Sequence, residues 1–208
     1  MKGNCGKLIN LGVGFQILYT VFKTAHNLAP QVLDDLGFGN MGFYSLAVVY
    51  MMFSLGSLIA ASIVNMLGER FSIVSGSITY ALYNGSFILA SAPSQFPEKA
   101  DSWYMQENFI TFVILFCSAT CGLGASVIWV SQGRYISRIA NDSNKGLYNS
   151  VFWSFYASAM LIGTLFGALV LKNTNSFTFY CVLTSINILA SLFFLTLPPV
   201  HPKKLNSI

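Results

Sequence analysis

A single lysine, Lys23, is the residue best placed to do chemistry, because it lies inside the long apolar segment Leu8–Ala29. A charged side chain within a membrane-spanning helix costs about 2.5–3.5 kcal/mol on insertion scales, and such residues mark binding sites or ion pathways. Helical periodicity places further polar side chains on the same face of the helix. The resulting polar stripe consists of Gln16, Thr20, Lys23 and Asn27, with His26 beside it.

Two hypotheses account for this stripe. In the first, the helix lines a polar cavity or a substrate path, and the four side chains face that cavity. In the second, Lys23 lies near the outer end of the helix, where its ammonium group extends to the lipid headgroups or pairs with Asp34 or Asp35. The sequence leaves both hypotheses open.

The other reactive residue types form no recognisable site. Cys117 and Cys121 lie one helical turn apart in an apolar run, but a metal site needs more ligands nearby than this run provides. We interpret both as small buried apolar residues. The sequence has no Ser-His-Asp set, no paired intramembrane carboxylates and no glycine-rich phosphate loop. We therefore predict no catalytic residue, no bound metal and no cofactor.

The composition excludes several classes of protein. Of the 208 residues, 9% are charged and 54% are hydrophobic. A soluble domain carries about 25% charged residues, so this chain lacks the charge to cover a water-facing surface. Soluble enzymes, nucleic-acid-binding proteins and disordered tails are excluded on this ground. Lys2 and Lys7 precede the first apolar run, which is full length and which we expect to be retained as a membrane span.

The apolar segments predict an all-α, polytopic membrane protein. A span needs about 20 mostly apolar residues, and six segments qualify. We expect residues 1–208 to form a single six-helix domain, in which consecutive helices are antiparallel neighbours because the connections are short. Pro93 is expected to close the third helix. The predicted spans are Leu8–Ala29, Phe43–Leu67, Phe71–Ala92, Phe109–Ser131, Leu147–Leu171 and Phe177–Leu197.

The distribution of lysine and arginine predicts the orientation. Six spans place both termini on one side, and that side holds eight Lys and Arg residues against two on the other. Positive residues concentrate in cytoplasmic loops, so both termini should be cytoplasmic, or in the matrix if the membrane is the mitochondrial inner one. The residues counted are Lys2, Lys7, Arg70, Arg134, Arg138, Lys145, Lys203 and Lys204, against Lys99 and Lys172.

Two stretches around the fourth and fifth spans carry a recognisable pattern. One ends the fourth helix with GLGASVIWVSQGRYIS, and the other, KGLYNSVFWSFYASAMLIG, begins the next helix. The pattern resembles the Unc-ninety-three-like branch of the major facilitator superfamily, the ion channel regulatory proteins, over nearly the whole chain. The matching residues are Gly124, Ala125, Trp129, Gln132, Gly133, Tyr135, Gly146, Asn149, Ser150, Phe152 and Trp153.

The resemblance implies that this chain is the N-terminal six-helix half of a major-facilitator-type fold. Between spans two and three, however, the chain keeps only Gly68 of the charged superfamily motif; Ala61, Asn65 and Glu69 stand at its other positions, and Arg70 follows. We therefore do not expect the gating charge network of ordinary transporters. Members of that fold bind substrate between two halves, and one half alone has no second wall.

Two further groups of residues each have two interpretations. Gly163 and Gly167 form a GxxxG pair, which either packs helices inside the bundle or presents a dimer face. Arg134 and Arg138 lie one turn apart after the fourth span, where they either fix the topology or bind anionic lipid headgroups.

The resemblance implies either an accessory protein that regulates channels or receptors, or a solute carrier. Because the sequence covers one half of the fold, we favour a non-catalytic membrane accessory or structural subunit. The alternative is a half-size transporter that works as a homodimer or with a separate second half. Polar residues inside the spans also predict a stable neighbour, another membrane subunit or a second copy, because they would otherwise meet lipid tails; they are Tyr80, Tyr83, Asn84, Tyr156 and Asn187.

The predicted topology can be tested with single cysteines introduced into the loops 93–108 and 132–146. An impermeant thiol reagent should label the two loops from opposite sides of the membrane, because one span, Phe109–Ser131, separates them. Equal labelling of both loops from one side would contradict six spans.

Overall fold

The computed structural model describes residues 2–99 and 102–200. In these ranges the chain forms six long α-helices and two short 3-10 helices, with no strand. All six long helices have the length and apolar composition needed to cross a membrane, which confirms the all-α, polytopic class. The elements are α1 (Lys2–Asp35), α2 (Met41–Leu67), α3 (Glu69–Gln95), η1 (Pro97–Lys99), η2 (Trp103–Met105), α4 (Glu107–Ile139), α5 (Lys145–Asn173) and α6 (Ser176–Phe194).

Two helices continue past a proline. Pro30 lies inside α1 and Pro93 lies inside α3, so the expectation that Pro93 closes the third helix is wrong. A proline removes one backbone donor and disturbs the turn before it. Each proline here lies within the last two turns of its helix, so the rest of the hydrogen-bond ladder is unaffected.

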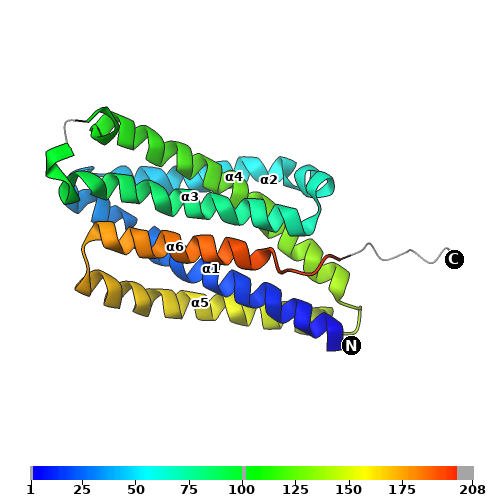
Figure 1. Cartoon of the computed structure of the whole chain (residues 1–208). Coiled ribbons are helices and arrows are strands. Elements are labelled where there is room, and N and C mark those ends of the chain that lie inside the picture. Colours follow the sequence, from blue (N-terminus) through cyan, green and yellow to red (C-terminus); the bar gives the residue numbers. More distant parts are fainter. Residues whose placement is uncertain (1, 100–101, 201–208) are drawn as a thin grey trace.

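The helices pack as two groups of three (Figure 1). Helices α2, α3 and α4 form one group, α1, α5 and α6 form the other, and α3 joins the two by packing on α6. Consecutive helices are antiparallel, as expected. The most extensive contacts join α2 with α4, α3 with α4, α1 with α5, and α3 with α6, so among the described helices α3 and α4 are the one consecutive pair that packs extensively. Short connections therefore fix the direction of each helix without making every pair of sequence neighbours pack closely.

Helix α1 lies at the centre and contacts all five of the other long helices. Its middle is aromatic, and the fully buried ring of Phe15 lies 5.0 Å from the ring of Phe152 and 5.5 Å from that of Phe194. Gly12 provides the space for a neighbouring ring, because a Cβ atom there would lie 2.5 Å from the ring of Phe155. Large buried rings such as Phe15, together with a glycine that admits a ring from α5, thus produce the close packing around α1.

The polar residues that were expected to need a partner protein are mostly buried inside the bundle itself. Tyr80, Tyr83, Asn84 and Asn187 are each no more than 1% exposed, so the bundle itself covers them and they do not require a partner protein. Only Tyr156 of the predicted group is partly exposed. One of these residues also joins two helices: the side-chain amide of Asn187 in α6 donates to the backbone carbonyl of Tyr80 in α3 at 3.4 Å.

Both ends of the described chain lie at the same end of the bundle, together with the α2–α3 and α4–α5 connections (Figure 1). This arrangement is what six spans require, whereas the side of the membrane on which these ends lie remains a prediction. Of the residues used to predict it, Lys203 and Lys204 fall outside the described residues, as does the side chain of Lys2.

The contact between α1 and α5 depends on two glycines. A Cβ atom at Gly163 would lie 2.6 Å from the backbone oxygen of Thr20, and the Thr24 hydroxyl donates to the Gly163 carbonyl at 2.6 Å. A Cβ atom at Gly167 would lie 2.6 Å from the Thr24 methyl carbon. Both glycines therefore lie inside the bundle, and they are not available to the dimer face that was the second interpretation.

Replacing Gly163 with alanine should separate α1 from α5 and destabilise the protein by about 1–3 kcal/mol, the usual cost of overpacking. Gly133→Ala is the matched control, because Gly133 lies in helix α4 with nothing within 4 Å of a Cβ atom. That control should be neutral or stabilising by up to about 1 kcal/mol, since alanine favours helix. Thermal unfolding of the detergent-solubilised variants measures both, and equal melting temperatures would contradict the prediction.

Candidate functional site

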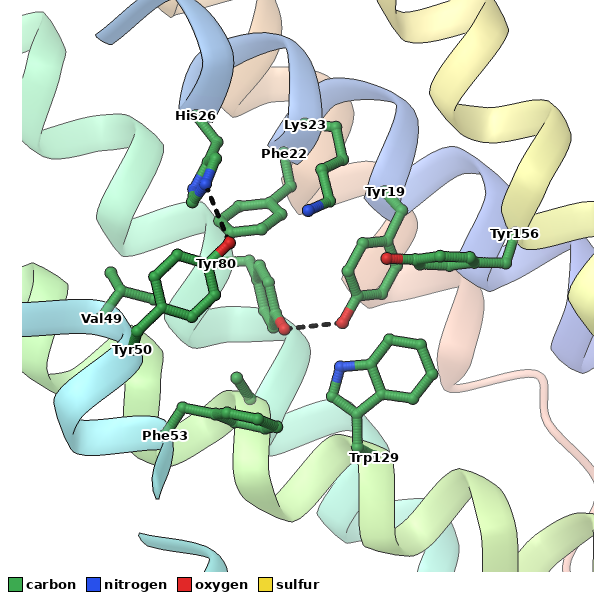
Figure 2. A pocket seen from close by; sticks show the side chains of 11 residues that line it. Tyr19, Phe22, Lys23, His26, Val49, Tyr50, Phe53, Tyr80, Trp129 and Tyr156 are labelled. Carbon is green, nitrogen blue, oxygen red and sulfur yellow. Dashed lines mark hydrogen bonds between the residues drawn. The ribbon is translucent and has the colours of Figure 1, made fainter. Parts of the chain in front are cut away.

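A pocket in the middle of the bundle brings together residues from five helices (Figure 2). Its volume is about 120 Å³, and it is open to the outside on one side. Lys23 enters it from α1, and no acidic residue lines it. The lining residues are Tyr19, Phe22, Lys23 and His26 of α1, Val49, Tyr50 and Phe53 of α2, Tyr80 of α3, Ala125 and Trp129 of α4, and Tyr156 of α5.

Two pairs of side chains form hydrogen bonds in the wall of this central pocket. The hydroxyl groups of Tyr19 and Tyr80 lie 2.7 Å apart, and both residues are at most 2% exposed. The hydroxyl of Tyr50 lies 3.2 Å from Nε2 of His26. These bonds hold the rings in place, since each joins α1 to a different neighbouring helix.

Lys23 differs from the other polar residues of the pocket because its ammonium group has no hydrogen-bond or ion-pair partner within residues 2–99 and 102–200. Its Nζ atom lies over the ring of Phe22, 6.0 Å from the ring centroid. Figure 2 shows the lysine side chain bent back between the rings of Phe22 and Tyr19. The predicted pairing of Lys23 with Asp34 or Asp35 is therefore absent among the described residues.

Aromatic rings form one side of the central pocket. The ring of Trp129 lies 5.4 Å from that of Tyr19 and 5.3 Å from that of Tyr156. Trp129 also stacks on Trp153 of α5, with ring centroids 5.7 Å apart and an angle of 18° between the planes. Because Trp153 is half exposed, these rings extend from the interior of the pocket to the outer surface of the bundle.

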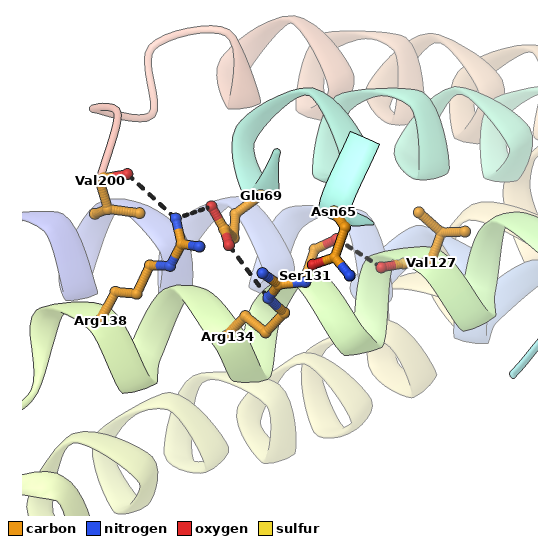
Figure 3. Close-up of polar contacts among 7 residues, drawn as sticks. All are labelled: Asn65, Glu69, Val127, Ser131, Arg134, Arg138 and Val200. Atoms are coloured by element: carbon orange, nitrogen blue, oxygen red, sulfur yellow. Dashed lines mark hydrogen bonds and ion pairs between the residues drawn. The ribbon is translucent and has the colours of Figure 1, made fainter. Parts of the chain in front are cut away.

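A cluster of charges lies at the end of the bundle that holds the described termini (Figure 3). Glu69 is 4% exposed and forms ion pairs with Arg134, at 3.3 Å, and with Arg138, at 2.8 Å. Glu69 is the first residue of α3, where the helix dipole favours a negative charge. Gly68 precedes it with a φ of 77°, a left-handed conformation that glycine adopts without strain.

The same cluster binds two neighbouring segments. Arg134 donates to the side-chain oxygen of Asn65 in α2 at 2.5 Å, and Arg70 donates to the carbonyl of Leu195. Tyr135 donates from its hydroxyl to the carbonyl of Pro198 at 2.8 Å. Through these contacts the ends of α2, α3 and α4 are joined to the segment that follows α6.

A comparison with known protein families assigns the chain. The family model described as ion channel regulatory protein UNC-93 matches residues 39–98 and 101–207, which is well over half of the sequence. This chain belongs to the UNC-93 family. The membership confirms the resemblance seen in the motifs around spans four and five, and it makes the protein an integral membrane protein of that family.

Individual relatives agree with this assignment. The chain is 31% identical to UNC93-like protein MFSD11 of Xenopus tropicalis, over 96% of this chain and 43% of that protein. It is 28% identical to UNC93-like protein 3 of Arabidopsis thaliana, over 78% of this chain and 32% of the relative. The chain thus spans less than half the length of the curated relatives that it matches. No solved structure matches it.

The polar stripe of this UNC-93 family member does not line one cavity. Only Lys23 of its four residues lines the central pocket. Gln16 donates to the hydroxyl of Ser158 at 2.8 Å, and it lines with Thr20 a separate hollow against α5 and α6. Asn27 is exposed near the end of the helix. The expectation fails because α5 packs directly against part of the stripe and divides it.

The family motif residues lie at helix contacts and at the pocket. Trp129 lines the pocket, Phe152 is fully buried against Phe15, and Trp153 stacks on Trp129. Gly124 lies where α4 approaches α3, because a Cβ atom there would overlap Thr79. The others lie along α4 and early α5: Gln132 is buried, Gly133 is exposed, Tyr135 bonds the segment after α6, and Asn149 donates to the Lys145 carbonyl at 3.0 Å.

The charge cluster corrects one expectation from the sequence. Although the superfamily motif between spans two and three is lost, a charge network is present at this position, with its carboxylate on α3 and its guanidinium groups on α4. Arg134 and Arg138 keep 32% and 25% of their side chains exposed, so each pairs with Glu69 and still reaches the surface. Their assignment to lipid headgroups therefore stays a prediction.

Sequence reasoning missed Glu69, Tyr19 and Tyr50. A helical count from Lys23 places Tyr19 one turn before it, so the spacing offered a signal for this residue. Tyr50 and Glu69 act through partners more than 20 residues away, and no local pattern identifies such pairs.

Replacing Glu69 with glutamine should destabilise the protein by about 1.5–3 kcal/mol, because hydrogen bonds to charged groups contribute that much and two arginines lose their partner. Glu98→Gln is the control, since Glu98 is an exposed carboxylate in η1, which follows the other end of α3. The melting temperature in detergent should fall for the first variant only. A fall of the same size in both variants would show that the cluster contributes no specific stability.

Proposed function

We propose that this chain is a non-catalytic membrane accessory protein that binds a second bundle of transmembrane helices through the outer faces of α2 and α5. The observation that carries the proposal is how little of these two helices the rest of the bundle covers. Both helices are far less covered by the rest of the bundle than α1, α3 and α4 are. They lie on either side of the central pocket, to which α2 and α5 both contribute residues.

Each of these faces presents small or hydroxyl side chains one or two helical turns apart. The exposed residues of this kind are Ala47, Ser54, Ser57 and Ala61 on α2, and Ser150, Ser154, Ala157, Thr164 and Ala168 on α5. In a membrane, lipid tails are as apolar as leucine, so helices associate where small residues let their backbones approach closely. Faces of this composition favour another helix over lipid as the neighbour.

The comparisons support this role in two ways. The matching family is described as an ion channel regulatory protein, which is a role exercised on another membrane protein. The relative MFSD11 of Xenopus tropicalis is matched over 43% of its length, so that protein has additional chain with which to cover such faces. The partner in this proposal is another membrane subunit or a second copy.

Solute transport is the second candidate, and the central pocket is the observation that favours it. The pocket lies between the two docking faces, where a second bundle would close its open side. Major-facilitator-type transporters bind substrate at such a position between two halves. A transporter and an accessory protein therefore share the docking faces and differ in whether solute crosses the membrane.

The docking faces are tested by placing a large side chain on each. Ser57→Trp and Ser154→Trp should prevent close approach of a partner helix and dissociate the assembly by at least about tenfold, as expected for a misfit of about 1.4 kcal/mol or more. Ser185→Trp is the matched control, because Ser185 is exposed on α6, which contributes nothing to the central pocket. Native mass spectrometry after gentle detergent extraction measures the size of the particle.

The wild-type chain and the Ser185 variant should appear in a particle larger than 22.8 kDa, and the other two variants should not. A functional monomer surrounded only by lipid would overturn the proposal. Reconstitution into liposomes then separates the two candidates, since solute uptake by the assembled particle favours transport.

A further inference from the structure

We propose that the central pocket is a binding site for a small monocarboxylate, with the carboxylate on the Lys23 ammonium group and the apolar part of the ligand against the aromatic rings. The proposal rests on the chemistry of the pocket and not on the docking faces of α2 and α5. It applies equally to an accessory protein that is regulated by this ligand and to a transporter that carries it.

The charge of the pocket selects an anion. The ammonium group of Lys23 enters a cavity whose eleven lining residues include no carboxylate, and it has no ion-pair partner among the residues that the structure describes. A charge removed from water is costly unless a counter-charge and hydrogen bonds compensate it. A bound carboxylate supplies both, and a cationic ligand would add a like charge to the pocket.

Neighbouring polar groups add donors for the same ligand. Tyr19 and Tyr80 share one hydrogen bond, so one of the two hydroxyl hydrogens is not used in that bond. His26 also lines the pocket, and its Nδ1 atom is buried without a hydrogen-bond partner in the described part of the chain. These groups lie on the walls that surround Lys23 (Figure 2), which fits a ligand that accepts several hydrogen bonds at one end.

The volume and the lining of the pocket limit the size and polarity of the part of the ligand that lies beyond its carboxylate. An apolar cavity of about 150 Å³ holds one benzene molecule, so a pocket of about 120 Å³ holds a slightly smaller guest, of roughly four to six non-hydrogen atoms. The rings of Phe22, Trp129 and Tyr156 provide apolar contact for a short carbon chain. A single positive charge matches a monoanion better than a dianionic phosphate.

A carboxylate reaches this pocket from one of two sources. It belongs either to a short water-soluble acid or to a membrane fatty acid whose chain leaves through the open side of the pocket. Both sources present the same carboxylate to Lys23, so the experiment includes one arm for each.

The test uses the full chain in nanodiscs of zwitterionic lipid, with propionate as the probe and propionamide as its uncharged counterpart of nearly equal shape. Ligand-observed NMR measures the two dissociation constants. Propionate should bind at least about tenfold more tightly than propionamide, since a charged hydrogen bond contributes that much. Lys23→Met should reduce this ratio to near one, whereas Lys172→Met, the same change at an exposed lysine, should leave it unchanged.

Equal binding of propionate and propionamide to the wild-type chain would overturn the proposal, and this comparison does not depend on whether any variant folds. Retention of the ratio in a folded Lys23→Met variant would also overturn it. In the second arm, oleate is added to the nanodiscs. Displacement of propionate by oleate assigns the site to a fatty acid, and undisturbed propionate binding assigns it to a soluble acid; both support a carboxylate site at Lys23.

Discussion

The structure depends on the close packing of one central helix, α1, against all of the others. In lipid there is little hydrophobic force to bring helices together, so a central helix is held by shape and by hydrogen bonds. Glycines provide that shape here. Gly12 on α1 provides the space for the ring of Phe155, and Gly163 on α5 admits the backbone of α1 closely enough for Thr24 to bond its carbonyl.

This central position also explains why a charged residue is tolerated in the first helix. Lys23 faces neither lipid nor a fully closed core, because the neighbouring helices leave around it a pocket that is open on one side and lined by aromatic rings. Its positive charge lies 6.0 Å from the face of Phe22, an arrangement that stabilises a cation by the ring's electron density. The helix that holds the bundle together is therefore also the helix that positions the pocket.

The end of the bundle that holds the described termini is stabilised differently from its middle. Around Glu69, ion pairs with Arg134 and Arg138 and hydrogen bonds to carbonyls replace glycine-mediated packing. The buried carboxylate of Glu69 joins the ends of α3 and α4, and Arg134 joins α4 to the end of α2 through Asn65. Since both arginines remain partly exposed, the network lies at the boundary between the bundle and its surroundings, where a movement of α2 against α4 would break it.

The sequence by itself determined the class of the protein, the number of spans, the small residues at which helices pack closely, and the family. Long uncharged apolar segments and local motifs are properties of contiguous residues, so they can be read without a structure. It also pointed to Lys23, since a charge in an apolar run is visible without a structure. Only the tertiary structure decided which side chains meet. Packing of α5 on α1 separated Gln16 and Thr20 from Lys23, and Tyr50 and Tyr80 reached the pocket from other helices. The sequence could not reveal the pairing of Glu69 with two arginines more than 60 residues away, because helix-on-helix contacts join residues whose spacing along the chain carries no periodic signal.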